Sequence, residues 1–246
     1  MKNIFNFKRY WAGKDSKFDT FLMVAAIAPV PIFEHFITRT AASITNSNKE
    51  KLSTKIRNEV IRLVSEELDH SHDHRTINKI MSEHGYPIDC INHNIEEYFL
   101  SFDDKKCQEK LALVVIMEFK IRQLSEDAPL SPLLFNEGVH FNTVKSFLLE
   151  HAKDELGHYN VSIDLYKELN IPRRILLKYL LKFSIGSFIG YIRILNRVLH
   201  SQNLGFKDTI YFWLHTTKRM FWGKQAIASS VIKSHIDLIR TVFLWK

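Results

Sequence analysis

Residues 147–166, FLLEHAKDELGHYNVSIDLY, are the stretch that decides how this chain folds. Within it His151, Glu155 and His158 follow one another at spacings of four and three residues, so a helix turns all three toward one side. Their neighbours are largely apolar: Phe147, Leu148, Val161, Ile163 and Leu165. Two imidazoles and a carboxylate that face an apolar core are costly to bury unless something there binds them. A metal ion is the usual solution, and it requires matching ligands elsewhere in the chain.

Three further segments supply such candidates. Glu67 and His70 have the Glu-x-x-His spacing on a predicted helix over residues 51–84, where Ile61, Val64, Leu68 and Ile77 suggest a buried face of helical period. Glu34 lies among Pro31, Phe33, Phe36 and Ile37, on a helix predicted to restart at about Pro31 and run past Ser43. Glu118 follows the apolar run at 111–117. A surface position remains open for Glu34, and an ion pair with Arg122 remains open for Glu118.

Together these residues predict a dinuclear metal site in a four-helix bundle. Such a bundle needs a Glu from each of two helices and a Glu-x-x-His from each of the other two. The predicted ligands are Glu34, Glu67, His70, Glu118, His151, Glu155 and His158. Four carboxylates balance two divalent ions, and mixed carboxylate and imidazole donors suit iron or manganese better than zinc. His151 is an additional imidazole beyond the usual set. We expect an all-α, ferritin-like four-helix bundle with additional C-terminal helices.

The composition agrees with a helical globular protein. The 246 residues are 46 % apolar and 25 % charged, and only eight Gly and six Pro interrupt them. Cys90 and Cys107 form no motif, which favours a reduced, cytoplasmic setting over a disulfide framework. We expect no secretory signal at the N-terminus. The longest uncharged apolar run, residues 21–33, contains two prolines and is too short to span a bilayer.

Charge divides the chain into two parts. From Ile171 onward thirteen Lys and Arg stand against two acids, a net charge of +11, whereas the whole chain carries +7. We therefore expect an acidic, His-rich bundle over residues 1–170 and a basic, aromatic tail over 171–246, packed on the bundle as one domain overall. The predicted tail helices span 173–202 and 206–244. Their basic and aromatic residues include Arg174, Lys178, Lys182, Arg193, Arg197, Phe212, Trp213, Lys218, Arg219, Phe221, Trp222, Lys224 and Trp245.

The tail has two interpretations. Its helices either pack on the bundle and expose a basic face, or they form an interfacial surface for anionic lipid, with aromatic rings at the level of the headgroups. Peripheral contact with the inner face of a membrane is thus one expectation. A nucleic-acid partner is not expected, because the chain carries no recognised nucleic-acid module.

These residues resemble two known families. The ligand order, with the extra His before the last Glu-x-x-His, is similar to that of the bacterial di-iron arylamine N-oxygenases. The sequence of residues 20–200 more closely resembles a ferritin-like family of predicted metal-dependent hydrolases. The matches to its two motifs are Glu67, His70, His74 and Asn78, then His151, Glu155, His158, Asp164 and Tyr166, while Glu150, Asp154, Gly157 and Tyr159 depart from it.

The resemblance implies a di-iron oxygenase that uses O2 and an external electron donor to oxidise a small organic molecule, at an amine nitrogen or by hydroxylation. The first alternative is a dinuclear metal-dependent hydrolase, and the second is a non-enzymatic metal-binding or membrane-associated protein. Three roles remain open for His74: an eighth ligand, a residue that contacts the ligands without binding the metal, or an acid/base in a pocket. The last two are preferred. Asp154 is expected to orient His158. A homodimer is left open.

Overall fold

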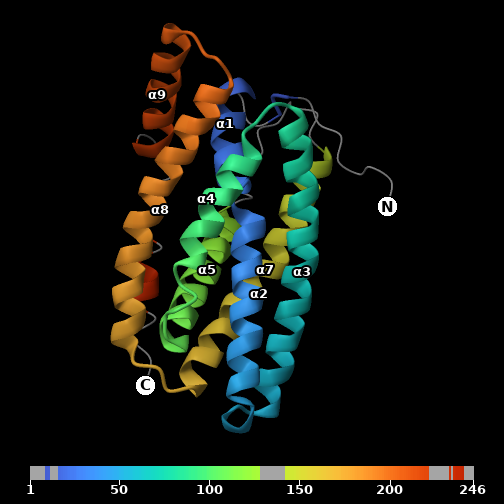
Figure 1. Ribbon diagram of the computed structural model, residues 1–246, viewed down its shortest axis with the longest axis vertical. Helices are drawn as coiled ribbons and strands as arrows, with labels where there is room; N and C mark the ends of the chain where they lie inside the picture. The colour runs from blue at the N-terminus through green and yellow to red at the C-terminus, as the bar shows by residue number, and fades with distance from the viewer. Residues whose placement is uncertain (1–8, 12–15, 128–141, 222–232, 234, 241–246) are drawn as a thin grey trace.

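The chain folds into helices. The computed structural model describes residues 9–11, 16–127, 142–221, 233 and 235–240, and every regular element in these ranges is helical (Figure 1). The elements are α1 (Ser16–Ile27), α2 (Val30–Ser47), the 3-10 turn η1 (Lys49–Lys51), α3 (Thr54–Glu83), α4 (Ile88–Leu100), α5 (Cys107–Asp127), α7 (Asn142–Glu168), α8 (Arg173–Ser201) and α9 (Phe206–Phe221). The expected all-α helical bundle is confirmed.

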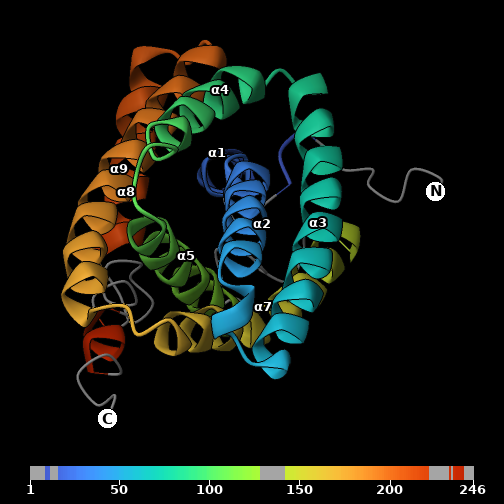
Figure 2. The same cartoon turned by 60° about the horizontal axis from the view of Figure 1, so that its bottom comes forward.

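Four helices form the bundle that the ligand spacing predicts. α2 packs against α3 and α5, and α7 packs against α5 and α3, so the four close a square around a shared core (Figure 2). Ser47, Cys107 and Leu169 line one small pocket, which puts the end of α2, the start of α5 and the end of α7 at the same end of the bundle. α3 and α5 therefore run parallel, and α4 forms the crossover between them, as in ferritin-like bundles.

Hydrogen bonds from α3 stabilise the break between α1 and α2. Pro31 carries no N–H, and the N–H of Ile32 donates to Pro29 (3.1 Å), so the carbonyl of Ala28 loses its usual helical donor. The amide of Asn78 donates to that carbonyl at 2.9 Å, and the hydroxyl of Ser71 donates to the carbonyl of Pro31 at 3.2 Å. Because both donors lie on the buried face of α3, they fix the start of α2, and with it the register of Glu34.

The buried face of α3 differs from the expected one. Ile61 is 66 % exposed and Leu68 51 %, whereas Val60, Leu63 and Glu67 are buried. The prediction that Ile61 and Leu68 face the core is wrong. Adjacent residues of a helix point about 100° apart, so a face that includes Glu67 turns Leu68 outward. The candidate metal ligands of this helix thus face the core, whereas two of its large apolar residues face outward.

The two C-terminal helices cover one side of the bundle. α8 packs along α5 and α1, and α9 packs on α1. Oδ1 of the buried Asp19 of α1 lies 2.8 Å from Nε2 of His215 on α9. Within the predicted helix over 206–244, α9 spans Phe206–Phe221 and residues 235–240 are helical, while the rest lies outside the described residues. Trp222, Lys224 and Trp245 lie outside the described residues, as does the side chain of Arg219.

Judged by length and composition alone, two stretches are long and apolar enough to cross a membrane. The length of uninterrupted apolar runs in the sequence did not predict them. They are Lys17–Ser47, of which 72 % of the apolar window is buried in the fold, and Arg173–Ser201, of which 22 % is buried. The first comprises α1 and α2 and carries Glu34 into the core, as core helices do. The second is α8, which buries both of its ends against the fold and exposes Leu181, Ile185, Phe188 and Ile189 in its middle.

The packing of α2 on α4 can be tested at Phe36, which is 1 % exposed and stacks on Phe99 with ring centroids 4.5 Å apart. Phe36→Ala removes a buried ring and leaves a cavity, so it should lower the free energy of unfolding by about 3–5 kcal/mol in urea titrations. Leu100→Ala, at a position 57 % exposed on the same α4, is the control and should change it by less than about 0.5 kcal/mol. Equal effects of the two substitutions would contradict this packing.

Candidate metal centre

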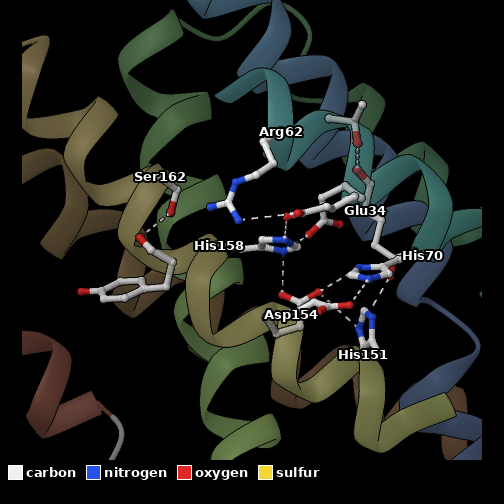
Figure 3. A network of polar contacts seen from close by, with 12 residues as sticks. Glu34, Arg62, His70, His151, Asp154, His158 and Ser162 are labelled. Carbon is white, nitrogen blue, oxygen red and sulfur yellow. Dashed lines mark hydrogen bonds and ion pairs between the residues drawn. The ribbon is translucent and has the colours of Figure 1, made fainter. Parts of the chain in front are cut away.

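All seven predicted ligands and His74 meet between the four bundle helices. Figure 3 labels Glu34, His70, His151 and His158 among them. α2 contributes Glu34, α3 contributes Glu67, His70 and His74, α5 contributes Glu118, and α7 contributes His151, Glu155 and His158. Each of the eight side chains is buried, with at most 8 % of its surface exposed. The open alternative of a surface position for Glu34 is therefore wrong, since this residue is 0 % exposed.

One group of donors comes from α3 and α7. Glu67, His70, Glu155 and His158 each offer a ligand atom within 4.8 Å of those of the others. His158 Nδ1 lies 2.7 Å from Glu67 Oε1 and 3.3 Å from Glu155 Oε2. His70 Nδ1 lies 3.5 Å from Glu155 Oε1. Two carboxylates and two imidazoles that converge in this way can surround a single ion.

A second group adjoins the first. Glu34, His74 and His151 also offer ligand atoms within 4.8 Å of one another, with His74 Nε2 3.4 Å from Glu34 Oε1. His151 Nε2 lies 3.9 Å from that oxygen and 3.3 Å from Glu155 Oε1. Glu155 Oε1 thus faces both groups, as a bridging carboxylate does. The geometry makes His74 a candidate ligand of the second ion, rather than the pocket residue that the sequence favoured.

Glu118 lies beside both groups. It is 0 % exposed, and the charges that act on it are those of Glu67, Glu155 and His158. The guanidinium of Arg122 lies over the ring of Tyr159, 5.4 Å from its centroid. These surroundings favour a role for Glu118 in the metal centre over a purely structural pairing with Arg122.

The buried carboxylates repel one another. Burial raises the pKa of Glu34 and of Glu118 well above the ordinary value, and the neighbouring carboxylates raise it further. Burial and Glu155 together raise the pKa of Glu67 to about 7. Without a cation at this site, these groups therefore hold protons to higher pH than ordinary carboxyl groups do, and Glu67 is about half protonated near pH 7.

The imidazoles divide into two kinds. Burial would lower the pKa of His158, but its contacts with Glu155 and Glu67 outweigh burial and raise that pKa to about 12. Burial also opposes the charge on Glu155, yet His158 and His70 hold the pKa of this carboxyl below its ordinary value. At His74 burial lowers the pKa well below its usual range, and at His151 burial lowers it to about 4. Neutral His74 and His151 are already in the form that binds metal.

The residues present fit two divalent cations. Among the described residues, both carboxylate oxygens of Glu34, Glu67, Glu118 and Glu155 are buried and lack a partner with hydrogen-bonding geometry, and the same holds for His158 Nδ1 and both ring nitrogens of His74. Buried polar atoms in such numbers require a ligand. Four carboxylates match the charge of two divalent ions, and oxygen and imidazole donors without thiolate suit iron, manganese or zinc.

Two outer carboxylates hold the ligating imidazoles across the α3–α7 interface. Asp154 Oδ2 lies 3.3 Å from His70 Nε2, and Glu66 Oε2 lies 3.0 Å from His158 Nε2 (Figure 3). The expectation that Asp154 orients His158 is wrong, because an i,i+4 spacing on one helix does not reveal a neighbour from another. Glu66 was missed for the same reason. Each contact leaves the Nδ1 of its imidazole facing the carboxylates of the first group.

A family model described as predicted metal-dependent hydrolase matches residues 2–244. The chain belongs to this family. The match extends over the C-terminal helices, beyond the residues 20–200 over which the sequence resemblance was drawn. No curated protein and no solved structure matches the chain. The similarity of the ligand order to that of the arylamine N-oxygenases stays a prediction.

Metal binding should release protons. Because burial and Glu155 raise the pKa of Glu67 to about 7, this carboxyl is largely protonated at pH 6.5 without metal and must ionise to bind a cation, and the raised pKa values of Glu34 and Glu118 act in the same direction. Calorimetric titration of the metal-free protein with Mn²⁺ should therefore give heats that vary with the ionisation enthalpy of the buffer. The apparent affinity should rise with pH between about 6 and 8. Heats that are the same in every buffer would contradict the raised pKa values.

Glu66 should affect metal affinity without being a ligand. Glu66→Gln weakens the hold on His158, so it should lower the affinity for the first ion about 10- to 100-fold. Glu59→Gln is the control, because Glu59 lies on the same helix and, like Glu66, pairs with a basic residue four positions away. The measurement is competition with a chelator of known affinity. Equal affinities of the two variants would show that Glu66 is only a surface acid.

Proposed function

We propose that the protein is a dinuclear metal-dependent hydrolase. The observation that carries this proposal is Glu155 Oε1, which lies 3.5 Å from His70 Nδ1 in one donor group and 3.3 Å from His151 Nε2 in the other. A shared carboxylate between adjacent groups is the arrangement that holds two ions side by side. The family to which the chain belongs supports the same reaction class.

In this proposal the candidate ligands form two groups, one for each ion. Glu67, His70, Glu155 and His158 would hold one ion, and Glu34, His74 and His151 the other, with Glu118 beside them. Two such ions supply Lewis-acid polarisation of the bond to be cleaved and lower the pKa of the attacking water.

In this proposal the protein's own side chains orient the candidate ligands and form an apolar border to the site. Asp154 and Glu66 fix two imidazole rings, and the ring of Phe147 stacks on His151 with centroids 5.9 Å apart. The same ring meets His74 edge-on at 5.0 Å, so an apolar wall borders the second donor group. A small organic molecule bound at this wall would lie next to the second ion.

A second function is favoured by the burial of the donors. Four carboxylates, each 0 % exposed, with imidazoles on the same four helices form the donor set that iron takes in ferritin-like oxygenases. In this alternative the protein binds two iron ions, uses O2 and an external electron donor, and oxidises a small organic substrate such as an amine. The ligand order, with its additional His151, supports it.

The two functions are separated by metal identity and by oxygen use. Elemental analysis of the purified protein gives the metals and their ratio to the chain, expected at two ions. Zinc- or manganese-loaded protein that cleaves activated esters or phosphodiesters, without oxygen uptake, supports the hydrolase. An Fe²⁺-loaded, anaerobic protein that consumes O2 and shows a transient visible absorption supports the oxygenase and overturns the hydrolase.

The ligand assignment is tested by metal content. His74→Ala removes a donor of the second group alone, so it should lower the metal content from two ions to about one, whereas His72→Ala, at an exposed position on the same helix, should leave two. Glu118→Ala should also lower the content below two, with the exposed Glu96→Ala as its control. Full occupancy in His74→Ala or in Glu118→Ala would remove that residue from the ligand set.

A further inference from the structure

The outward face of α9 carries five large exposed apolar residues. Phe206 is 81 % exposed, Tyr211 69 %, Leu214 64 %, Phe221 56 % and Ile210 45 %. Their spacings of mostly three and four residues, with one longer interval before Phe221, place them on one side of the helix. The inner side is also apolar where it meets α1, since Phe212 packs on Phe18 with centroids 5.7 Å apart. A helix that is apolar on both sides is suited to a second apolar environment on its outer side.

The outward face of α8 continues this pattern. Leu181 is 65 % exposed, Ile185 55 %, Phe188 50 % and Ile189 44 %, at positions i, i+4, i+7 and i+8. Figures 1 and 2 both show α8 and α9 on the side of the molecule away from α3. In the described part of the chain, the other large exposed apolar residues occur in ones and twos on α3, α4 and the segment 235–240. Nine such residues on two neighbouring helices exceed what a monomer's surface usually exposes.

Positive charge accompanies these apolar residues. Lys178, Lys182 and Arg193 are exposed before and after the apolar part of α8, and Lys207 and Lys218 are exposed on α9. The sequence of α8 contains no acid, and the single acid of α9, Asp208, pairs with Lys17 at 2.6 Å. The surface of both helices therefore combines exposed apolar side chains with an excess of positive charge.

We propose that this α8–α9 face binds the surface of an anionic phospholipid bilayer. Basic side chains are attracted to the anionic headgroups, and the aromatic and aliphatic side chains enter the boundary between headgroups and acyl chains. A second copy of the chain is a poorer occupant, because a symmetric interface would bring two tails of net charge +11 together. The proposal does not depend on the reaction at the metal centre.

The experiment is co-sedimentation of the whole, metal-loaded protein with vesicles. Vesicles of phosphatidylcholine containing 30 mol % phosphatidylglycerol should pellet the protein, and pure phosphatidylcholine vesicles should bind it at least tenfold more weakly. Raising NaCl from 0.1 to 0.5 M should reduce binding to the anionic vesicles severalfold, because salt screens the attraction to the headgroups.

Two variants locate the surface. Tyr211→Glu/Leu214→Glu replaces exposed apolar side chains of α9, and Lys182→Glu/Arg193→Glu reverses charge on α8. Each should weaken binding to anionic vesicles at least tenfold. The matched controls are Ile61→Glu/Leu100→Glu, at positions 66 % and 57 % exposed, and Lys79→Glu/Lys105→Glu, and each should bind within about twofold of the parent protein.

The outcomes decide the proposal. Metal content and helical circular dichroism equal to those of the parent protein show that a variant is folded. Absence of pelleting, equal binding to neutral and anionic vesicles, or equal losses in variants and controls would each overturn it. Light scattering that shows a dimer, abolished by Tyr211→Glu/Leu214→Glu in a protein that does not pellet, would assign the face to self-association instead.

Discussion

Four carboxylates with no exposed surface lie in the middle of this bundle, and the rest of the structure depends on how their charge is balanced. An isolated ionised carboxylate in a protein interior is costly, and four whose charges act on one another are more so. The chain offers two remedies, protons on Glu34, Glu67 and Glu118 or cations held by the donors around them. The apolar residues of α2, α3, α5 and α7 supply the stability that makes such a centre tolerable.

The candidate metal centre also affects how the surrounding helices are oriented. α3 turns Glu67, His70 and His74 inward, and so exposes Ile61 and Leu68, which a purely apolar face would have buried. The same face of α3 carries Ser71 and Asn78, whose hydrogen bonds fasten the break before α2. One helix thus provides ligands for both ions and also fixes the helix that presents Glu34.

Much of the fold and of the candidate site could be predicted from the sequence, because a Glu-x-x-His and a lone acid in an apolar run are local patterns. Relations between helices could not be predicted. Nothing in the spacing along one helix shows that Glu66 reaches His158 or that Asp154 reaches His70, since each pair joins α3 to α7.

The two carboxylate–imidazole contacts between α3 and α7 have a consequence for the separation of these helices. His70 on α3 is held by Asp154 on α7, and His158 on α7 is held by Glu66 on α3, so polar contacts cross the interface in both directions. An ion bound between them joins the same two helices. Local unfolding in which α3 separates from α7 must therefore break the ion's coordination and both outer contacts in one event. A bound ion can therefore stay no longer than the interface between α3 and α7 stays closed.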